Sequence, residues 1–175
     1  KRIHDKSIVV VVIGDGAADE GVVYETMNFA ALQTLPMLFI SENNGYSVYS
    51  RQADRQANPD IPARARAFGL DVREPEQIDV DAISALANSA VRSLRDGSAP
   101  ILIELPTYRL CTHVGPEDED KPGYRPAEEV SQWRRREPLG KQSLDAILKT
   151  DEDRQQWTRW IEEIDREIAE AFEFA

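Results

Sequence analysis

The sequence has few of the residues that tie small proteins together through disulfides or metals. Cys111 is its one cysteine, which excludes an internal disulfide and suits a reducing compartment. It has no Cys-x-x-Cys pair and only 2 histidines, so we expect no structural zinc site. Its stability must therefore come from a hydrophobic core, for which 175 residues are enough.

Basic residues and long apolar runs are also scarce. The chain has 21 lysines and arginines against 32 acidic residues, a net charge of −11, which argues against a nucleic-acid surface. The basic cluster at 134–136 lies among glutamates; we interpret it as a solvated helix face, with a partner-docking patch as the alternative. The longest apolar run, Ile8–Ile13, is strand-sized, whereas a bilayer span needs about 20 residues. We therefore expect neither nucleic acid nor a membrane as a partner.

What the sequence does have is an alternation of apolar strands and helical stripes. Ser7–Ile13 is continuously apolar and β-branched, which predicts a strand covered on both faces. Met37–Ile40, Pro100–Leu105 and, more weakly, Asp71–Arg73 follow as further strands, and residues 83–94 form a helical stripe that ends before Gly97. This order predicts an α/β fold with a mainly parallel sheet and helices on both faces.

The remainder of the chain differs in character. Residues 111–126 have no periodicity and are rich in proline, glycine and acids, which predicts a long loop of the kind that often carries function. Two helical tracts follow over 127–175, and we expect the second, strongly amphipathic one to pack on the flank of the α/β domain at 1–110. The chain begins with Lys1 rather than Met and enters a strand almost at once, which we interpret as an interior cut.

Two polar segments follow predicted strands, where parallel sheets bind ligands. In Gly14-Asp15-Gly16, the carboxylate suits Mg²⁺, while the amides of Gly16 and Ala17 suit a phosphate group. In the second segment, 42–46, the side chain of Asn44 offers another oxygen ligand. Each segment alone has a simpler interpretation: a turn with Asp15 or Asp19 as a helix cap, or a hairpin turn at Asn44-Gly45. Together they favour a site for Mg²⁺ and a diphosphate.

The spacing of the two segments points to a known family. Residues 17 to 42, which is 26 residues, separate Gly16 from Asn43, and this resembles the motif of thiamine-diphosphate enzymes. The stretches GDGAADEGVVYETMNFAALQTLPMLFISENNGYSVYS, PILIELPTYR and GYRPAEEVSQWRRREPL are similar to the α subunit of the E1 component of 2-oxoacid dehydrogenases, namely the pyruvate, branched-chain and acetoin types. The similarity extends to Leu139 and implies the C-terminal portion of that subunit, with a partial thiamine-diphosphate-binding fold.

The resemblance assigns roles to individual residues. It implies that Asp15 and Asn44 ligate Mg²⁺ through their side chains, that Tyr46 adds its carbonyl oxygen, and that the amides of Gly16 and Ala17 meet the diphosphate of thiamine diphosphate. The cofactor-facing loop histidine of the family corresponds to His113, which would hydrogen-bond near the diphosphate and the reacting centre as a cofactor-binding and catalytic residue.

Several residues depart from the family pattern. Cys111 stands where a histidine is frequent, and we interpret it as a small loop residue because no activating base is evident. Val114 replaces a serine that mitochondrial members phosphorylate, which excludes that modification here. The acidic run 117–120 also differs from the usual loop and leaves the substrate open.

The activity implied is oxidative decarboxylation of a 2-oxo acid with acyl transfer to a lipoyl carrier. The implied partners are an E1 β-like subunit in a heterotetramer, a lipoyl acyltransferase (E2) and the N-terminal half of the same subunit, which this sequence lacks. The alternatives are another thiamine-diphosphate-dependent carboligase or decarboxylase, and a non-catalytic assembly subunit that retains the fold. We expect a protein of the bacterial cytoplasm, with the mitochondrial matrix as the alternative.

Overall fold

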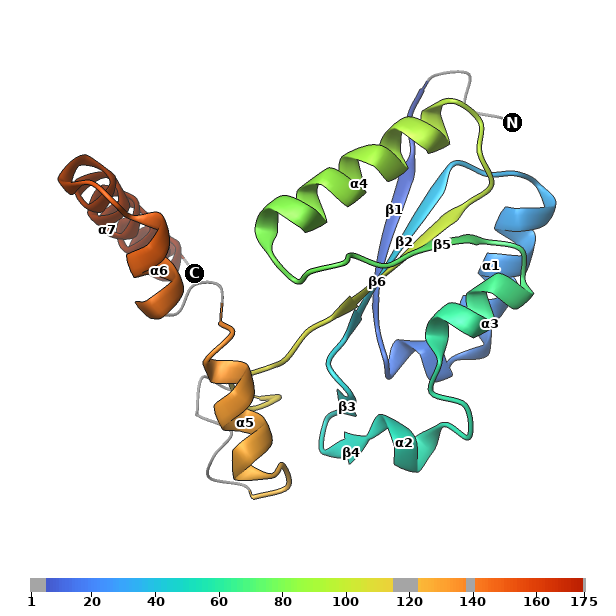
Figure 1. Cartoon of the computed structure of the whole chain (residues 1–175), viewed down its shortest axis with the longest axis horizontal. Helices are drawn as coiled ribbons and strands as arrows, with labels where there is room; N and C mark the ends of the chain where they lie inside the picture. The colour runs from blue at the N-terminus through green and yellow to red at the C-terminus, as the bar shows by residue number, and fades with distance from the viewer. Residues whose placement is uncertain (1–5, 115–122, 138–140, 175) are drawn as a thin grey trace. The chain divides into compact units, whose positions relative to one another are not determined.

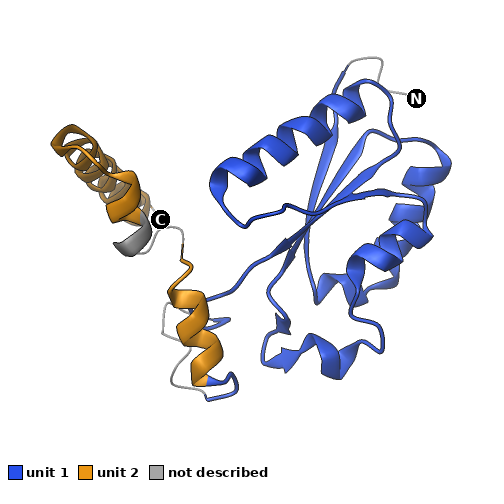
Figure 2. Ribbon diagram, in the orientation of Figure 1, with its two compact units in different colours: residues 1–126 blue, residues 127–175 orange. Residues whose placement is uncertain are grey.

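The chain divides into two compact units, Lys1–Pro126 and Ala127–Ala175, shown in blue and orange in Figure 2. The computed structural model describes residues 6–114, 123–137 and 141–174. The acidic run 117–120 therefore lies outside the described residues.

The first unit is built on a four-stranded parallel sheet (Figure 1). Its strands are β1 (Val9–Gly14), β2 (Met37–Asn43), β6 (Ile101–Pro106) and β5 (Asp71–Arg73), in the order β1-β2-β6-β5, and every neighbouring pair is parallel. The predicted α/β class with a parallel sheet is confirmed. Because β1, β2 and β6 run in register, their carboxyl ends lie side by side at one edge of the sheet.

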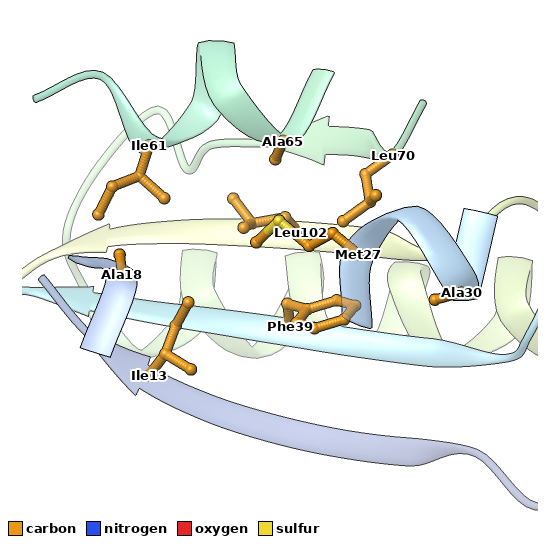
Figure 3. Packing of buried hydrophobic residues seen from close by; sticks show 9 residues of the cluster. All are labelled: Ile13, Ala18, Met27, Ala30, Phe39, Ile61, Ala65, Leu70 and Leu102. Atoms are coloured by element: carbon orange, nitrogen blue, oxygen red, sulfur yellow. The ribbon is translucent and has the colours of Figure 1, made fainter. Parts of the chain in front are cut away.

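Helices cover both faces of this sheet because alternate residues along each strand point to opposite sides. One face packs against α1 (Gly21–Leu32), α3 (Ile61–Ala67) and the short 3-10 turn η1 (Ala17–Asp19). Figure 3 shows the nine buried residues of this layer: Ile13, Ala18, Met27, Ala30, Phe39, Ile61, Ala65, Leu70 and Leu102. Full burial of each large apolar side chain contributes about 1.5–3 kcal/mol, so this layer is a main source of stability.

The opposite face packs against α4 (Val80–Arg95). Its buried residues are Leu38, Ala90, Leu94, Ile101 and Ile103. The helix begins at a conventional cap, because the side chain of Asp79 accepts a hydrogen bond of 2.8 Å from the backbone N–H of Ala82. The helical stripe that was predicted over 83–94 is thus present and faces the sheet.

Strand β1 departs from expectation. The valine run predicted a strand covered on both faces, but Val9, Val10 and Val12 are 47%, 50% and 57% exposed. This part of the prediction is wrong because β1 is the outermost strand of the order, and α4 packs over β2 and β6 instead. A run of valines encodes a strand, but it does not encode how many neighbours cover that strand.

The segment after β2 contains a small hairpin. Strands β3 (Tyr46–Ser47) and β4 (Ser50–Arg51) pair antiparallel, and the short helix α2 (Gln52–Arg55) follows directly. The turn of this hairpin contains Val48, whose φ of 54° is unusual for a β-branched residue. The hairpin turn considered at Asn44-Gly45 is therefore wrong, since β2 pairs in the parallel sheet and β3 pairs with β4.

The second unit is helical, with α5 (Ala127–Arg134), α6 (Lys141–Ile147) and α7 (Asp151–Phe174). A capping box starts α7: Thr150 N–H donates to Asp153 Oδ2 (3.0 Å) and Asp153 N–H donates to Thr150 Oγ1 (3.1 Å). These hydrogen bonds lower the pKa of Asp153. The apolar stripe of α7 is half or more exposed at Trp160, Ile164, Ile168 and Phe172, and its packing on the α/β unit stays a prediction. No helix among the described residues is long and apolar enough to cross a membrane.

Candidate functional site

The two polar segments meet at the carboxyl edge of the sheet. Gly14 at the end of β1 lies level with Glu42 in β2, so the loops that leave both strands start side by side. They also touch, because a Cβ atom added to Gly16 would lie 2.8 Å from the Cβ of Ser47 and closer still to its hydroxyl. Glycine at position 16 is therefore required by the close approach of the hairpin.

Asp15 is the buried anion of this edge. The residue is 1% exposed, and its carboxylate forms an ion pair with the guanidinium of Arg55 at the end of α2. Arg55 pairs at the same time with Asp19. Since a buried carboxylate without a partner is costly, loss of such a pair destabilises a protein by about 3 kcal/mol.

Neither aspartate acts as a helix cap. The N-cap of η1 is Gly16 and that of α1 is Glu20, and neither position has a side-chain capping bond. The interpretation of Asp15 or Asp19 as a cap is therefore wrong. Gly16 and Ala17 instead begin η1, where backbone N–H groups have no partner within the turn.

The adjacent asparagines have different roles. The side chain of Asn43 donates to Gln52 Oε1 (3.1 Å) and Glu104 Oε1 (3.0 Å), and accepts from the N–H of Gly45 (2.9 Å). Asn44 accepts from the N–H of Tyr46 (2.9 Å), which leaves its oxygen a second lone pair. Both N–H donors of the Asn43 side chain are thus used within the edge, whereas the oxygen of each asparagine accepts one backbone N–H.

A chain of amides joins the two segments. From Glu104 it passes through Asn43 to Gln52, whose Nε2 donates to Gln56 Oε1 (3.0 Å). The Nε2 of Gln56 then donates to the carbonyl oxygen of Asp15 (2.9 Å). Both glutamines are 8% exposed. Sequence reasoning missed them; the available signal was two glutamines four residues apart, in the stretch that follows the asparagine segment.

Glu104 is the carboxyl group at the inner end of this row of hydrogen-bonded side chains. It lies opposite Ser41 in the parallel register and is 8% exposed. Burial is the largest influence and raises the pKa of Glu104, while the nearby Ser41 hydroxyl and the hydrogen bond from Asn43 oppose the increase.

His113 belongs to the exposed segment after β6, and Arg109 ties that segment to the hairpin. Arg109 Nη1 lies 2.9 Å from His113 Nδ1, and Arg109 Nη2 donates to the carbonyl oxygen of Val48 (3.0 Å) and to the hydroxyl of Tyr124 (2.9 Å). Because a guanidinium has donors only, Nδ1 must accept, and the proton of the neutral ring lies on Nε2. Cys111 is exposed, as a small loop residue would be.

Tyr46 anchors the hairpin. The residue is 7% exposed, and the edge of its ring meets the ring of Tyr124 with centroids 5.7 Å apart. The guanidinium of Arg125 lies 5.5 Å from the Tyr46 ring centroid and 4.4 Å from that of Tyr108. Aromatic and cation–π contacts therefore fix the backbone at Tyr46, whose carbonyl was predicted as a metal ligand.

The donor set at this edge suits a hard cation. The carboxylate of Asp15, the amide oxygen of Asn44 and a backbone carbonyl are the oxygen ligands that Mg²⁺ prefers. Within the described residues, no group of three or more His, Cys, Asp or Glu gathers for a metal, and no hydrogen bond joins Asp15 to Asn44. A cation here would therefore depend on one carboxylate and on neutral oxygens.

Comparison with solved structures first gives the class of fold. A transketolase from Pichia stipitis superimposes with a TM-score of 0.55 at 20% identity, covering 89% of this chain and 24% of that one. At this identity the likeness shows a shared α/β fold and nothing more.

Comparison of sequences then gives the family. The model of the family described as dehydrogenase E1 component matches residues 1–175, so the chain belongs to that family. The pyruvate dehydrogenase E1 component subunit alpha of Rhizobium meliloti is 37% identical over 128 residues, which cover 73% of this chain and 36% of that protein. The mitochondrial 2-oxoisovalerate dehydrogenase subunit alpha of Homo sapiens is 30% identical over 176 residues, which cover 100% of this chain and 39% of that protein. The pyruvate dehydrogenase E1 component subunit alpha of Rickettsia felis is 33% identical over 172 residues, which cover 97% of this chain and 51% of that protein. The chain thus spans between about a third and a half of these relatives.

Proposed function

We propose that this chain is the C-terminal portion of an E1 α-like subunit, and that the edge around Asp15 binds Mg²⁺ and the diphosphate of thiamine diphosphate. The observation that supports this most strongly is the junction of the two strand-end segments. Gly16 lies against Ser47, and Gln52 and Gln56 link Asn43 to Asp15 by hydrogen bonds. Two segments 26 residues apart in the sequence thus form one rigid edge.

In this proposal the side chains of Asp15 and Asn44 and the carbonyl of Tyr46 hold Mg²⁺. The backbone N–H groups of Gly16 and Ala17 bind diphosphate oxygens, to which the glycine allows close approach. The neutral amide of Asn44 suits this position because it adds no charge beside a diphosphate. The metal would neutralise part of that charge and hold the cofactor by its polar end.

Thiamine diphosphate, when bound, supplies the carbon nucleophile that attacks a 2-oxo group and allows CO₂ to leave. The proposed part of His113 is to move or donate a proton near this reaction. Its contact with Arg109 supports the role, because it orients the ring and leaves the Nε2–H group as the donor.

The rest of the proposed cofactor site lies outside the residues of this chain, which spans only 36–51% of the length of the relatives compared above. We infer that the upstream half of the subunit and an E1 β-like partner supply it, and that a lipoyl acyltransferase receives the acyl group. The complete activity is then oxidative decarboxylation of a 2-oxo acid.

Co-expression with the upstream half and an E1 β-like partner tests this function. The assembled protein should reduce an artificial electron acceptor when given a 2-oxo acid, thiamine diphosphate and Mg²⁺. A panel of pyruvate, branched-chain and other 2-oxo acids would identify the substrate. If the assembled protein forms and binds the cofactor but reduces the dye with none of them, the non-catalytic assembly subunit is the better account.

A further inference from the structure

The arginine that pairs with Asp15 has a position that the proposed metal site does not explain. Arg55 ends α2, and its two terminal nitrogens bridge two aspartates: Nη2 binds Asp15 Oδ2 and Nη1 binds Asp19 Oδ2. Asp15 is the buried member of the pair, with 2% of its side chain exposed, against 33% for Asp19. A positive charge therefore already compensates the carboxylate that is proposed to bind Mg²⁺.

A guanidinium and a divalent cation on the same carboxylate repel one another. A guanidinium has no lone pair with which to join the coordination shell of the metal. Arg55 and Mg²⁺ would consequently compete for Asp15.

The surroundings of Arg55 allow this exchange. Its side chain is 19% exposed and borders an open hollow of about 580 Å³, lined also by Asp19, Gln56, Asn58 and Arg64. Within the described part of the chain, the buried Nε of Arg55 has no hydrogen-bond partner, so the polar contacts of its guanidinium are the ion pairs of Nη1 and Nη2. A rotation into the hollow would free Asp15, expose Nε to water and keep Asp19 within reach.

We propose that Arg55 is a positioning residue that occupies Asp15 in the metal-free state and is displaced when Mg²⁺ binds. This inference rests on the proposed Mg²⁺ site at Asp15. The arginine keeps the buried carboxylate paired while the cofactor is absent, and it weakens binding of Mg²⁺ that arrives without a diphosphate. When Mg²⁺ binds together with the anionic diphosphate, in contrast, the diphosphate brings negative charge with which the displaced guanidinium can pair.

The test compares the full chain with its Arg55→Gln variant in thermal melts, first in EDTA and then in rising MgCl₂ without thiamine diphosphate. We expect the variant to melt below the parent chain in EDTA, because Asp15 loses its cation. Mg²⁺ should then raise the melting temperature of the variant by several degrees more than that of the parent, and should bind it about tenfold or more tightly. If the variant is unfolded in EDTA, the expected result is that Mg²⁺ restores folding.

Controls separate this role from general stabilisation. Arg66→Gln removes an ion pair with Glu74 (2.9 Å) in which both side chains are half-exposed, and it should leave the Mg²⁺ response unchanged. Arg55→Lys keeps the positive charge but lacks the two terminal nitrogens that bridge Asp15 and Asp19, so its Mg²⁺ response should lie between those of the parent chain and Arg55→Gln.

Two outcomes overturn the proposal in different ways. An equal Mg²⁺ response in the parent and Arg55→Gln chains, or a variant that stays unfolded in Mg²⁺, shows that Arg55 is only structural; the metal site at Asp15 can then still stand. If, in addition, Asp15→Ala leaves Mg²⁺-dependent cofactor binding of the assembled protein unchanged, the metal site is itself wrong.

Discussion

Replacement of Gly16 by alanine tests how closely the two loops must approach. Gly16 has φ −70° and ψ −38°, a conformation open to any residue, so the substitution introduces no backbone strain. Its only penalty is the new methyl group, which would lie 2.8 Å from Ser47 Cβ, where rotation of the hydroxyl gives no relief. Overpacking of this kind costs about 1–3 kcal/mol. For a chain of 175 residues, each 1 kcal/mol lowers the melting temperature by roughly 2–4 °C.

A double-mutant cycle measures this contact in urea or thermal unfolding. Ser47→Gly removes the clashing atoms and leaves only the backbone, 3.9 Å away, so Gly16→Ala should cost at least about 1 kcal/mol less in that background. Gly21→Ala is the matched control, because no atom lies within 4 Å of its Cβ position, and it should be neutral or slightly stabilising. If Gly16→Ala costs the same with and without Ser47, the two loops do not meet as described.

Three further predictions concern the polar groups of the edge. Because burial raises the pKa of Glu104, its stabilising contribution is complete below pH 4.5 and lost as the pH rises through the elevated value. In parallel melts, the stability of Glu104→Gln relative to the parent should therefore increase from acidic to neutral pH, and a difference that does not change with pH would refute the buried charge. Gln56→Ala should lower the free energy of unfolding, measured in urea, by about 1–3 kcal/mol, because it leaves the carbonyl of Asp15 unpaired. An unchanged free energy of unfolding would mean that the hydrogen bond from Gln56 does not stabilise the fold. His113→Ala should leave cofactor affinity of the assembled protein nearly unchanged while lowering its turnover about 10²-fold or more, and normal turnover would exclude His113 from the reaction.

The parallel sheet and the meeting of its strand ends were predictable, for physical reasons. The apolar runs Met37–Ile40 in β2 and Ile101–Ile103 in β6 are covered by helices on both faces, and such runs are visible in the sequence alone. Parallel strands also place their carboxyl ends at one edge, so Asp15 and Asn44 could be assigned to the same region before any coordinates.

The contacts that complete the edge were not predictable. Arg55 and Gln56 reach residues 36 to 41 positions earlier, and no periodic pattern connects charged or amide side chains across such a distance. The exposure of Val10 and Val12 depends on which elements lie beside β1, which a local pattern cannot specify. The spacing of the two segments was thus enough to predict where the edge lies, but the contacts that stabilise it depend on tertiary packing.

Calorimetric titration of thiamine diphosphate into the assembled protein tests the central claim most directly. With Mg²⁺ present the parent should bind and release heat, and chelation of Mg²⁺ or the substitution Asp15→Ala should abolish the signal. Asp54→Ala, which removes an exposed carboxylate from the same short helix as Arg55, is the control and should bind like the parent. Undiminished binding by Asp15→Ala would contradict the account.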